Sequence, residues 1–517
     1  MKNCIEFQKK LFLLAVVLIP FAVIPNMVRL NVLGSMGTKL SIYPIIIAIC
    51  LAFWQEHRYK NFFQNSELFI KYSVVYLAVL VISLLYGLYG FPYWNLIDIG
   101  QINKLVILNT YMIGHGIIFP QTLLVKTWVM IRFTKNIILT YIFTFGVSYW
   151  VYCLFYNNGK EAIKLLIRGI ITATILVLGY SVFDLFYLAG NEVATGILQI
   201  INPFMHTIEA DGTSWPPLLW MGQLRSLFAE PSYFGMYAAF VLPILSIWLF
   251  EKKRKYLPLS FLFFLIFCDF MTNARTAILL LLEEVGLLCL LAVYLKKKNI
   301  WQTFGMLVCC ILIAFVCDAS FNGYCNQKLS NPAMAKLLSE KQFGAYLDNN
   351  LGSLTGVHKR SNLSRFSIAF AEVQIGIENP IFGVGSDLST AYIPSHFPDF
   401  LEKNQEMTSW VDRQARYGIL KNPIPKLTEY TARFAETGIL GLGMFLLPFL
   451  YAFLKKGILL KKTKKTRDKY VIGCMGISII ALLVVGIGDQ INIFYSMWLI
   501  FGVFLTIQFN EQDSGAE

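Results

Sequence analysis

Five arginines lie beside long apolar stretches of the chain, where their side chains could meet an anionic ligand. They are Arg225, Arg275, Arg360, Arg365 and Arg433. A guanidinium group stays charged at physiological pH and binds a phosphate through two parallel hydrogen bonds. An unpaired arginine at membrane depth costs several kcal/mol, so such residues usually face a partner or a cavity. The set therefore predicts a phosphate-binding pocket, and snorkelling into the headgroup region is the alternative for any single member.

Carboxylates and one histidine accompany these arginines. Glu230 directly precedes Pro231, so it could cap a helix or pair with Arg225. His396 is a candidate general base in a loop. Further carboxylate candidates are Glu372, Glu429 and Glu436. The chain has no HExxH, DxD or P-loop motif, and the glycines of "GVGSDL" follow no strand, so we expect a turn there and no metal or cofactor.

The composition indicates that lipid surrounds the elements that carry these residues. Hydrophobic residues make up 56% of the chain and charged residues 15%, and the mean hydropathy is +0.58. Soluble domains are about half apolar and a quarter charged. The net charge of +13 comes from short lysine runs between apolar segments. That pattern is typical of cytoplasmic loops near anionic lipid and excludes a nucleic-acid-binding protein.

The lysine runs orient the predicted helices. "KKRK" at 252–255, "KKK" at 296–298 and the lysine-rich stretch 455–469 should all face the cytoplasm. The segments 189–230 and 319–430 and the turn that holds Asp489 should then lie outside. We interpret 103–119 as a partial helix, which gives about twelve spans with both termini inside; fourteen is the alternative.

The predicted fold is therefore an all-α polytopic membrane protein with one large extracytoplasmic loop. We expect an N-terminal transmembrane bundle at 1–318, a helical loop domain at 319–430 and C-terminal transmembrane helices at 431–510. Cys317 and Cys325 flank the start of that loop, where a disulfide could form.

Four motifs resemble a known family when they are taken in order. They are "LRSLFAEPSYFG", "TNARTAILLLL", "SRFSIAFAEVQIGIENPIFGVGSDL" and "RFAETGILGLGMF". Their order, their spacing and the large outer loop are similar to the O-antigen polymerase and ligase superfamily, which includes Wzy-type polymerases and WaaL-type ligases. The resemblance covers about residues 220–455.

The resemblance implies a GT-C-like, metal-independent membrane glycosyltransferase that works without a cofactor at the outer leaflet of the bacterial inner membrane. Polymerases of this kind move a glycan from undecaprenyl diphosphate onto the next lipid-linked repeat unit, whereas ligases move it to the lipid A core. On matching positions, the arginines around the diphosphate leaving group would be Arg225, Arg275 and Arg365. Glu230 completes the candidate catalytic set. The candidate substrate-binding residues are Arg360, Arg433, Tyr233, Asn273, Glu429 and His396. Membrane lipid, a chain-length regulator and a flippase are the expected partners.

One departure from the family pattern favours a polymerase over a ligase. Ligases carry a histidine-containing motif just before the "AETG" helix, whereas this chain has Thr428 and Glu429 there. The general base then stays open between Glu429, Glu230 and His396, or the leaving group does most of the work. A flippase is the alternative from another class, because it would bind the same lipid-linked sugar without changing it.

Overall fold

The structure, a computed structural model, describes residues 2–22, 30–60, 62–63, 67–206, 222–328, 360–398, 405–491 and 494–508. All the regular secondary structure in these ranges is helical, in agreement with the predicted fold class.

Eight helical segments are long and apolar enough to cross a bilayer. They are α3 (Glu67–Tyr89), the rod made of α5 (Gln121–Tyr141), η5 (Ile142–Gly146) and α6 (Val147–Leu154), α7 (Gly159–Leu188), α9 (Pro231–Glu251), α11 (Arg275–Leu295), α12 (Lys298–Lys328), α18 (Glu429–Lys462) and α19 (Thr466–Val485). Four further helices pack among them: α1 (Lys2–Val17), α2 (Ile42–Tyr59), α10 (Tyr256–Met271) and α20 (Tyr495–Thr506). The chain is thus a multi-pass membrane protein, and the count of about twelve spans stays a prediction, because eight of its described helices are long and apolar enough to cross a bilayer.

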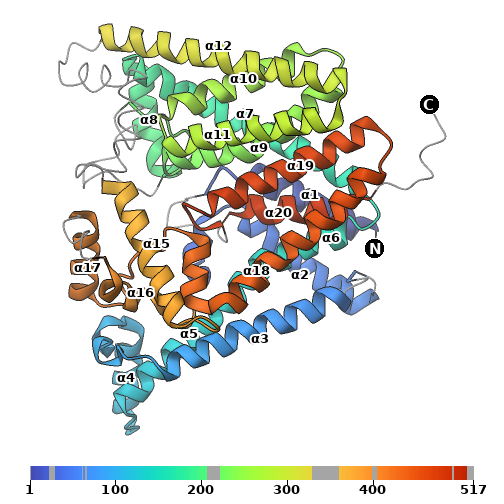
Figure 1. Ribbon diagram of the computed structural model, residues 1–517. Helices are drawn as coiled ribbons and strands as arrows, with labels where there is room; N and C mark the ends of the chain where they lie inside the picture. The colour runs from blue at the N-terminus through green and yellow to red at the C-terminus, as the bar shows by residue number, and fades with distance from the viewer. Residues whose placement is uncertain are drawn as a thin grey trace.

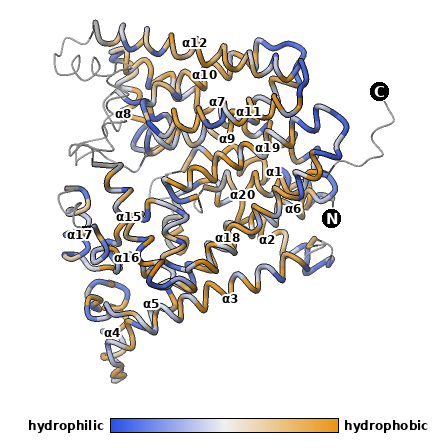
Figure 2. The backbone as a smooth tube through the Cα atoms, in the orientation of Figure 1, coloured by the Kyte–Doolittle hydropathy of each residue, from blue (hydrophilic) through white to orange (hydrophobic). Residues whose placement is uncertain are grey.

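The two ends of this bundle differ in composition (Figures 1 and 2). The lysine-rich loops after α9, α11 and α18 gather at one end, on the right in Figure 1, which we call the basic end. The opposite end, which we call the cap end, holds the short or polar helices α4 (Asn103–Gly114), α8 (Glu192–Met205), α15 (Arg360–Glu378), α16 (Ser389–Tyr392) and α17 (Gln405–Tyr417). Hydrophobic residues dominate the rods between the two ends, as Figure 2 shows.

The segment predicted not to cross the membrane forms α4, which has 12 residues. At 1.5 Å per residue it is about 18 Å long, against about 30 Å for the hydrocarbon core. Two short 3₁₀-helices, η3 (Trp94–Leu96) and η4 (Ile99–Gln101), connect α3 to α4.

The predicted start of the outer loop at residue 319 falls inside α12, which continues to Lys328. Cys317 and Cys325 therefore both belong to that helix, and neither forms a disulfide. Eight residues of helix separate them by about 12 Å, beyond the roughly 7 Å Cα separation that a disulfide can span. The disulfide considered from the sequence is thus wrong.

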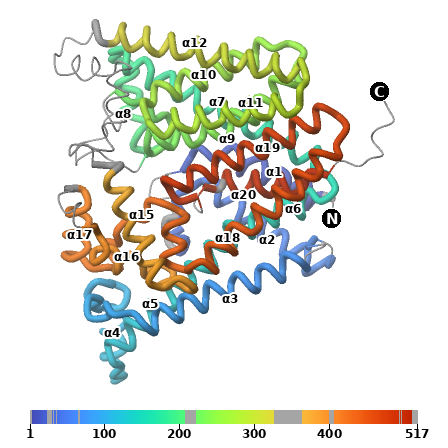
Figure 3. Tube along the Cα trace, viewed as in Figure 1, coloured from blue at the N-terminus to red at the C-terminus, as the bar shows by residue number. Residues whose placement is uncertain are grey.

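A glycine breaks α18 near its start and lets the cap reach the bundle. Gly438 has a φ of +62°, and a Cβ there would lie 2.3 Å from the carbonyl carbon of Ile381. Only glycine allows this approach. Residues 380–388, which we call the cap turn, pack into the break, and the Val384 amide donates to the Ala435 carbonyl at 2.9 Å. The predicted turn is confirmed, and Figure 3 shows α3 and α15 beside α18 although they are far apart in sequence.

Candidate functional site

A polar cavity of about 90 Å³ lies at the cap end, where α3, α5, the cap turn and the start of α18 meet. We call it the central cavity. Its polar lining residues include Tyr76, Asn136, Asp387, Lys426, Glu429, Arg433 and Glu436. Ligand pockets usually measure about 300 Å³ or more, so this cavity fits only the polar head of a ligand in the present conformation.

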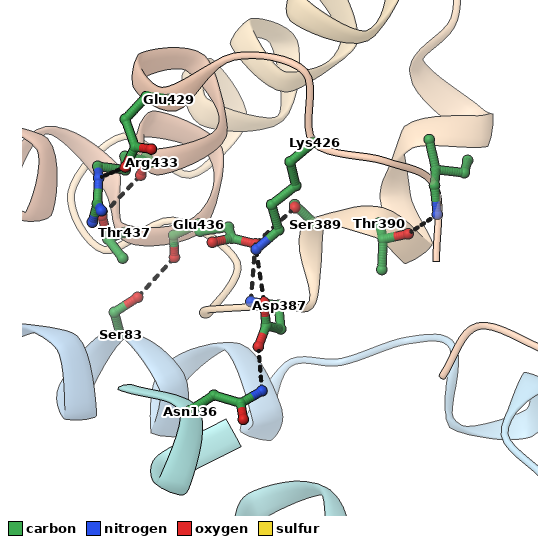
Figure 4. Close-up of polar contacts among 11 residues, drawn as sticks. Ser83, Asn136, Asp387, Ser389, Thr390, Lys426, Glu429, Arg433, Glu436 and Thr437 are labelled. Atoms are coloured by element: carbon green, nitrogen blue, oxygen red, sulfur yellow. Dashed lines mark hydrogen bonds and ion pairs between the residues drawn. The ribbon is translucent and has the colours of Figure 1, made fainter. Parts of the chain in front are cut away.

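Lys426 joins the cap turn to α18 (Figure 4). Its Nζ lies 2.7 Å from Asp387 Oδ1 and 2.6 Å from Glu436 Oε1. Asn136 on α5 donates to Asp387 Oδ2 at 3.0 Å, and the Asp387 amide donates to Glu436 Oε1 at 2.9 Å. Three segments distant in sequence thus supply one charged network.

The geometry keeps Asp387 ionised. Burial alone would raise the pKa of its carboxyl, but the Lys426 ammonium outweighs burial and holds that pKa below its usual value. Burial would lower the pKa of Lys426, and its two carboxylate neighbours raise it instead. Asp387 also has a φ of +64°, a conformation that a non-glycine residue rarely adopts and that clusters at functional sites.

Arg433 forms the second charged group of the central cavity (Figure 4). Its Nε lies 2.5 Å from Glu429 Oε1, one helical turn earlier in α18. Its Nη1 donates to the Tyr76 hydroxyl at 3.1 Å, and its Cζ lies 3.8 Å from the ring centroid of Phe445. No described residue accepts a hydrogen bond from Nη2. The guanidinium is therefore held in one orientation and retains donors for a ligand.

A buried carboxyl supports the start of α18. Glu372 on α15 is fully buried, and its Oε2 accepts from Thr431 Oγ1 at 2.6 Å and from Thr428 Oγ1 at 3.1 Å. Burial raises the pKa of Glu372 to about 7. Because the two threonines flank Glu429, Glu372 helps to fix the turn that orients Glu429 and Arg433.

Arg365, Glu230 and Tyr233 lie near the turn between α19 and α20. That turn lines the central cavity through Gln490. Arg365 donates a hydrogen bond to the carbonyl of Gly488 in that turn. The neighbouring Asp489 interacts electrostatically with Arg365 and Glu230, and Tyr233 lies in the same electrostatic environment. The structure thus brings Arg365, Glu230 and Tyr233 close to one turn of the cavity wall. The roles proposed for them stay predictions.

Arg225 lies elsewhere, inside the bundle. Its side chain is 1% exposed, and none of its three guanidinium nitrogens has an acceptor among the described residues. Asp184 on α7, which accepts from the Ser226 amide at 2.7 Å, is the main opposite charge that acts on Arg225. Arg225 is not among the residues that line the central cavity.

Asn273, Arg275 and His396 are not among the residues that line the central cavity either. Asn273 donates to the Gly222 carbonyl at 3.1 Å, and Arg275 begins α11. His396 Nε2 lies 3.1 Å from Glu378 Oε2 within the cap. The side chain of Arg360 lies outside the described part of the chain.

Sequence reasoning missed four polar residues of the central cavity, namely Tyr76, Asn136, Asp387 and Lys426. Asn136 is a polar residue in an apolar span, and Lys426 is a lysine in a predicted outer segment, so each carried a weak signal. No local pattern joins them, because their contacts depend on the break at Gly438. Among the described residues, no group of three or more His, Cys, Asp or Glu side chains could hold a metal ion.

These observations define a polytopic helical membrane protein with a charged cavity at the end opposite its lysine-rich loops. A family model described as O-antigen ligase matches residues 259–415, from α10 to α17. That match, over less than a third of the chain, confirms the resemblance to the O-antigen polymerase and ligase superfamily, which is an enzyme family. Searches of curated proteins and of solved structures found no match.

Proposed function

We propose that the protein is a membrane glycosyltransferase that polymerises undecaprenyl-diphosphate-linked repeat units into O-antigen, capsular polysaccharide or exopolysaccharide. The observation that carries the proposal is Arg433, which Glu429 and Tyr76 orient and which keeps donors free in a cavity at the cap end. The positive-inside pattern supports a cap end on the outer side of the inner membrane. A lipid-linked sugar that has crossed the membrane would meet the cavity there.

The proposed reaction is a nucleophilic substitution at the anomeric carbon, in which one bond forms and one bond breaks. A hydroxyl oxygen of the acceptor sugar bonds to the anomeric carbon of the donor, and the bond from that carbon to the diphosphate oxygen breaks. The diphosphate takes the electron pair, and the hydroxyl proton goes to a base. Arg433 and Lys426 would stabilise the charge that grows on the diphosphate, so side-chain cations would serve in place of a metal ion.

We assign proton acceptance to Asp387. Among the carboxylates of the cavity its side chain is the most exposed, at 33%, against 10% for Glu436 and 2% for Glu429. Lys426 keeps it ionised, and each of its oxygens has a lone pair beyond those used by Lys426 and Asn136. Glu429 would act as a positioning residue for Arg433.

An O-antigen ligase is the second candidate, because the matching family model carries that description. The polymerase is favoured by the residues before the "AETG" stretch, where Thr428 bonds to Glu372 and no histidine is present. The two activities differ only in the acceptor, which is a lipid-linked repeat unit in one case and the lipid A core in the other.

An acceptor competition experiment tests this choice. Purified protein receives a radiolabelled lipid-linked donor with either acceptor, in buffer that contains EDTA. The polymerase predicts elongation on the lipid-linked acceptor, no transfer to the lipid A core and no effect of EDTA. Transfer to the core alone would replace the polymerase with the ligase. Movement of unchanged substrate across a vesicle, without either product, would support a flippase instead.

A further inference from the structure

A second and larger pocket lies at the cap end, between α4, α5 and the segment after α17. Its volume is about 600 Å³. Its basic lining residues are Lys104, Arg132, Lys135 and Lys421, and no carboxylate lines it. We call it the basic pocket.

The positive charges of the basic pocket are not neutralised by the described part of the protein. No described carboxylate forms an ion pair with Lys104, Lys135 or Lys421. Arg132 donates from Nη1 to the Leu420 carbonyl at 3.5 Å, and its charge also acts on Asp387. Like charges that share a small volume repel one another, and a bound anion removes that repulsion.

The basic pocket also lies at an end of the protein where lysines are not expected. The lysine runs that orient the chain lie at the basic end, and the basic pocket lies at the opposite end beside α4. Positive residues are depleted from short outer loops of membrane proteins. A cluster on that side therefore needs a reason other than topology, and recognition of an anion supplies one.

Apolar surface next to the charges indicates that the anion belongs to a lipid. Trp128, Ile102 and Ile131 line the pocket together with the cations. The adjoining α4 is too short to cross the bilayer, yet Ile107 on it is 69% exposed. Ile118, just beyond its end, is 91% exposed. Such a surface suits an amphipathic molecule whose chain lies along α4 and whose head enters the pocket.

We propose that the basic pocket binds the phosphate or diphosphate head of a lipid from the outer leaflet. Lys104, Lys135 and Lys421 contact the phosphate oxygens, and Arg132 closes the side toward the central cavity. The lipid is either a second lipid-linked glycan or an anionic phospholipid, since both present the same chemistry. The first source rests on the proposed function, because a polymerase needs a donor and an acceptor that each carry a lipid diphosphate.

The helix α5 gives the first source a structural basis. It carries Arg132 and Lys135 toward the basic pocket, and it carries Asn136, which bonds to Asp387, toward the central cavity. A sugar attached to a diphosphate in the basic pocket therefore lies one helix width from the proposed proton acceptor. That arrangement suits the acceptor substrate.

The test replaces the three exposed lysines and keeps the partly buried arginine. The triple variant Lys104→Gln, Lys135→Gln, Lys421→Gln is compared with a control, Lys461→Gln, Lys464→Gln, Lys465→Gln, which removes three exposed lysines from the basic end. Both full-length proteins are placed in phosphatidylcholine nanodiscs. Binding of decaprenyl diphosphate, phosphatidylglycerol and inorganic pyrophosphate is measured, and the KM of the lipid-linked acceptor is measured in the elongation assay.

We expect the triple variant to bind at least one lipid probe ten times more weakly than the wild type, while the control binds as the wild type does. Loss of decaprenyl diphosphate with a raised acceptor KM identifies the lipid-linked glycan, and loss of phosphatidylglycerol alone identifies a phospholipid. Unchanged affinity for both lipids, or loss of pyrophosphate binding alone, overturns the proposal. If the triple variant binds lipid more weakly than the wild type but the wild type makes no polymer, the result contradicts the proposed function and still supports lipid binding in the basic pocket.

Discussion

Glu429 and Arg433 lie one helical turn apart at the start of α18, and Nε of the arginine is 2.5 Å from Oε1 of the glutamate. The glutamate side chain is 2% exposed and the arginine side chain is 14% exposed. Both side chains line the central cavity, and the guanidinium is the more exposed of the two. The ion pair thus holds the Arg433 guanidinium in position to bind the diphosphate of a substrate.

Replacing Arg433 by lysine should lower kcat at least a hundredfold with little effect on folding. A lysine places one charge on a flexible stem and cannot reproduce the planar fork that meets both the diphosphate and Glu429. The measurement is the elongation rate of purified protein, with thermal unfolding as the check on folding. Arg467→Lys is the matched control, because that arginine pairs with Glu251 at the basic end. A wild-type rate for Arg433→Lys would contradict the role given to this residue.

Lys426→Met should destabilise the protein and inactivate it. The substitution leaves Asp387 and Glu436 close together without their shared cation. Removing one partner of a buried ionic network costs about 3–5 kcal/mol, and the partial exposure of this one puts it near the lower limit. Adding Glu436→Gln to the variant should recover part of the stability but none of the activity. Thermal unfolding in detergent measures the effect, and a double variant no more stable than the single one would count against the network.

Arg225→Ala should act through stability. The arginine is 1% exposed, so truncation leaves a cavity inside the bundle and removes the main opposite charge that acts on the buried Asp184. Truncation of a large buried side chain costs about 2–5 kcal/mol, and we expect a low yield of folded protein. The double variant Arg225→Met, Asp184→Leu should fold better than Arg225→Ala and should regain activity in proportion. If the double variant folds well but makes no polymer, Arg225 acts in the chemistry, as the family resemblance implies.

Glu372 should make stability depend on pH near neutrality. Burial raises its pKa from an ordinary 4.5 to about 7, so the folded protein holds the proton more tightly than the unfolded chain. The stabilising contribution is complete below pH 4.5 and is lost as the pH rises to about 7. Glu372→Gln removes this dependence and should be more stable than the wild type at pH 8, by on the order of 3 kcal/mol. Thermal unfolding from pH 5 to pH 8 measures it, and parallel curves for the two proteins would refute the assignment.

Hydropathy and lysine placement predict much of the fold, because burial in lipid constrains every span by its own composition. The short helix at 103–119, the turn at 383–388 and the separation into two ends follow from local residues. Glu429 and Arg433 could be assigned to one site because they lie on the same helix face, four residues apart.

The rest of the site depends on contacts that no local pattern encodes. A sequence indicates that Arg225 lies just before an apolar span but not the direction in which it points, and the opposite charge of Asp184 lies 41 residues earlier, on α7. Lys426, Asp387 and Asn136 meet only because the break at Gly438 admits the cap turn. Asp184, Asp269 and Glu284 are also buried within the spans, and their burial depends on packing between helices that no local pattern encodes.

The proposed polymerase activity is tested most directly by elongation of a fluorescently labelled lipid-linked repeat unit by the purified protein. We expect a ladder of products that differ by one repeat unit, with one undecaprenyl diphosphate released for each new linkage. Asp387→Asn and Arg433→Ala should each abolish both signals while the folded protein still binds the substrate. A wild-type protein that leaves the repeat unit unchanged would contradict the proposed polymerase function, and a ladder that persists in both variants would contradict the roles given to Asp387 and Arg433.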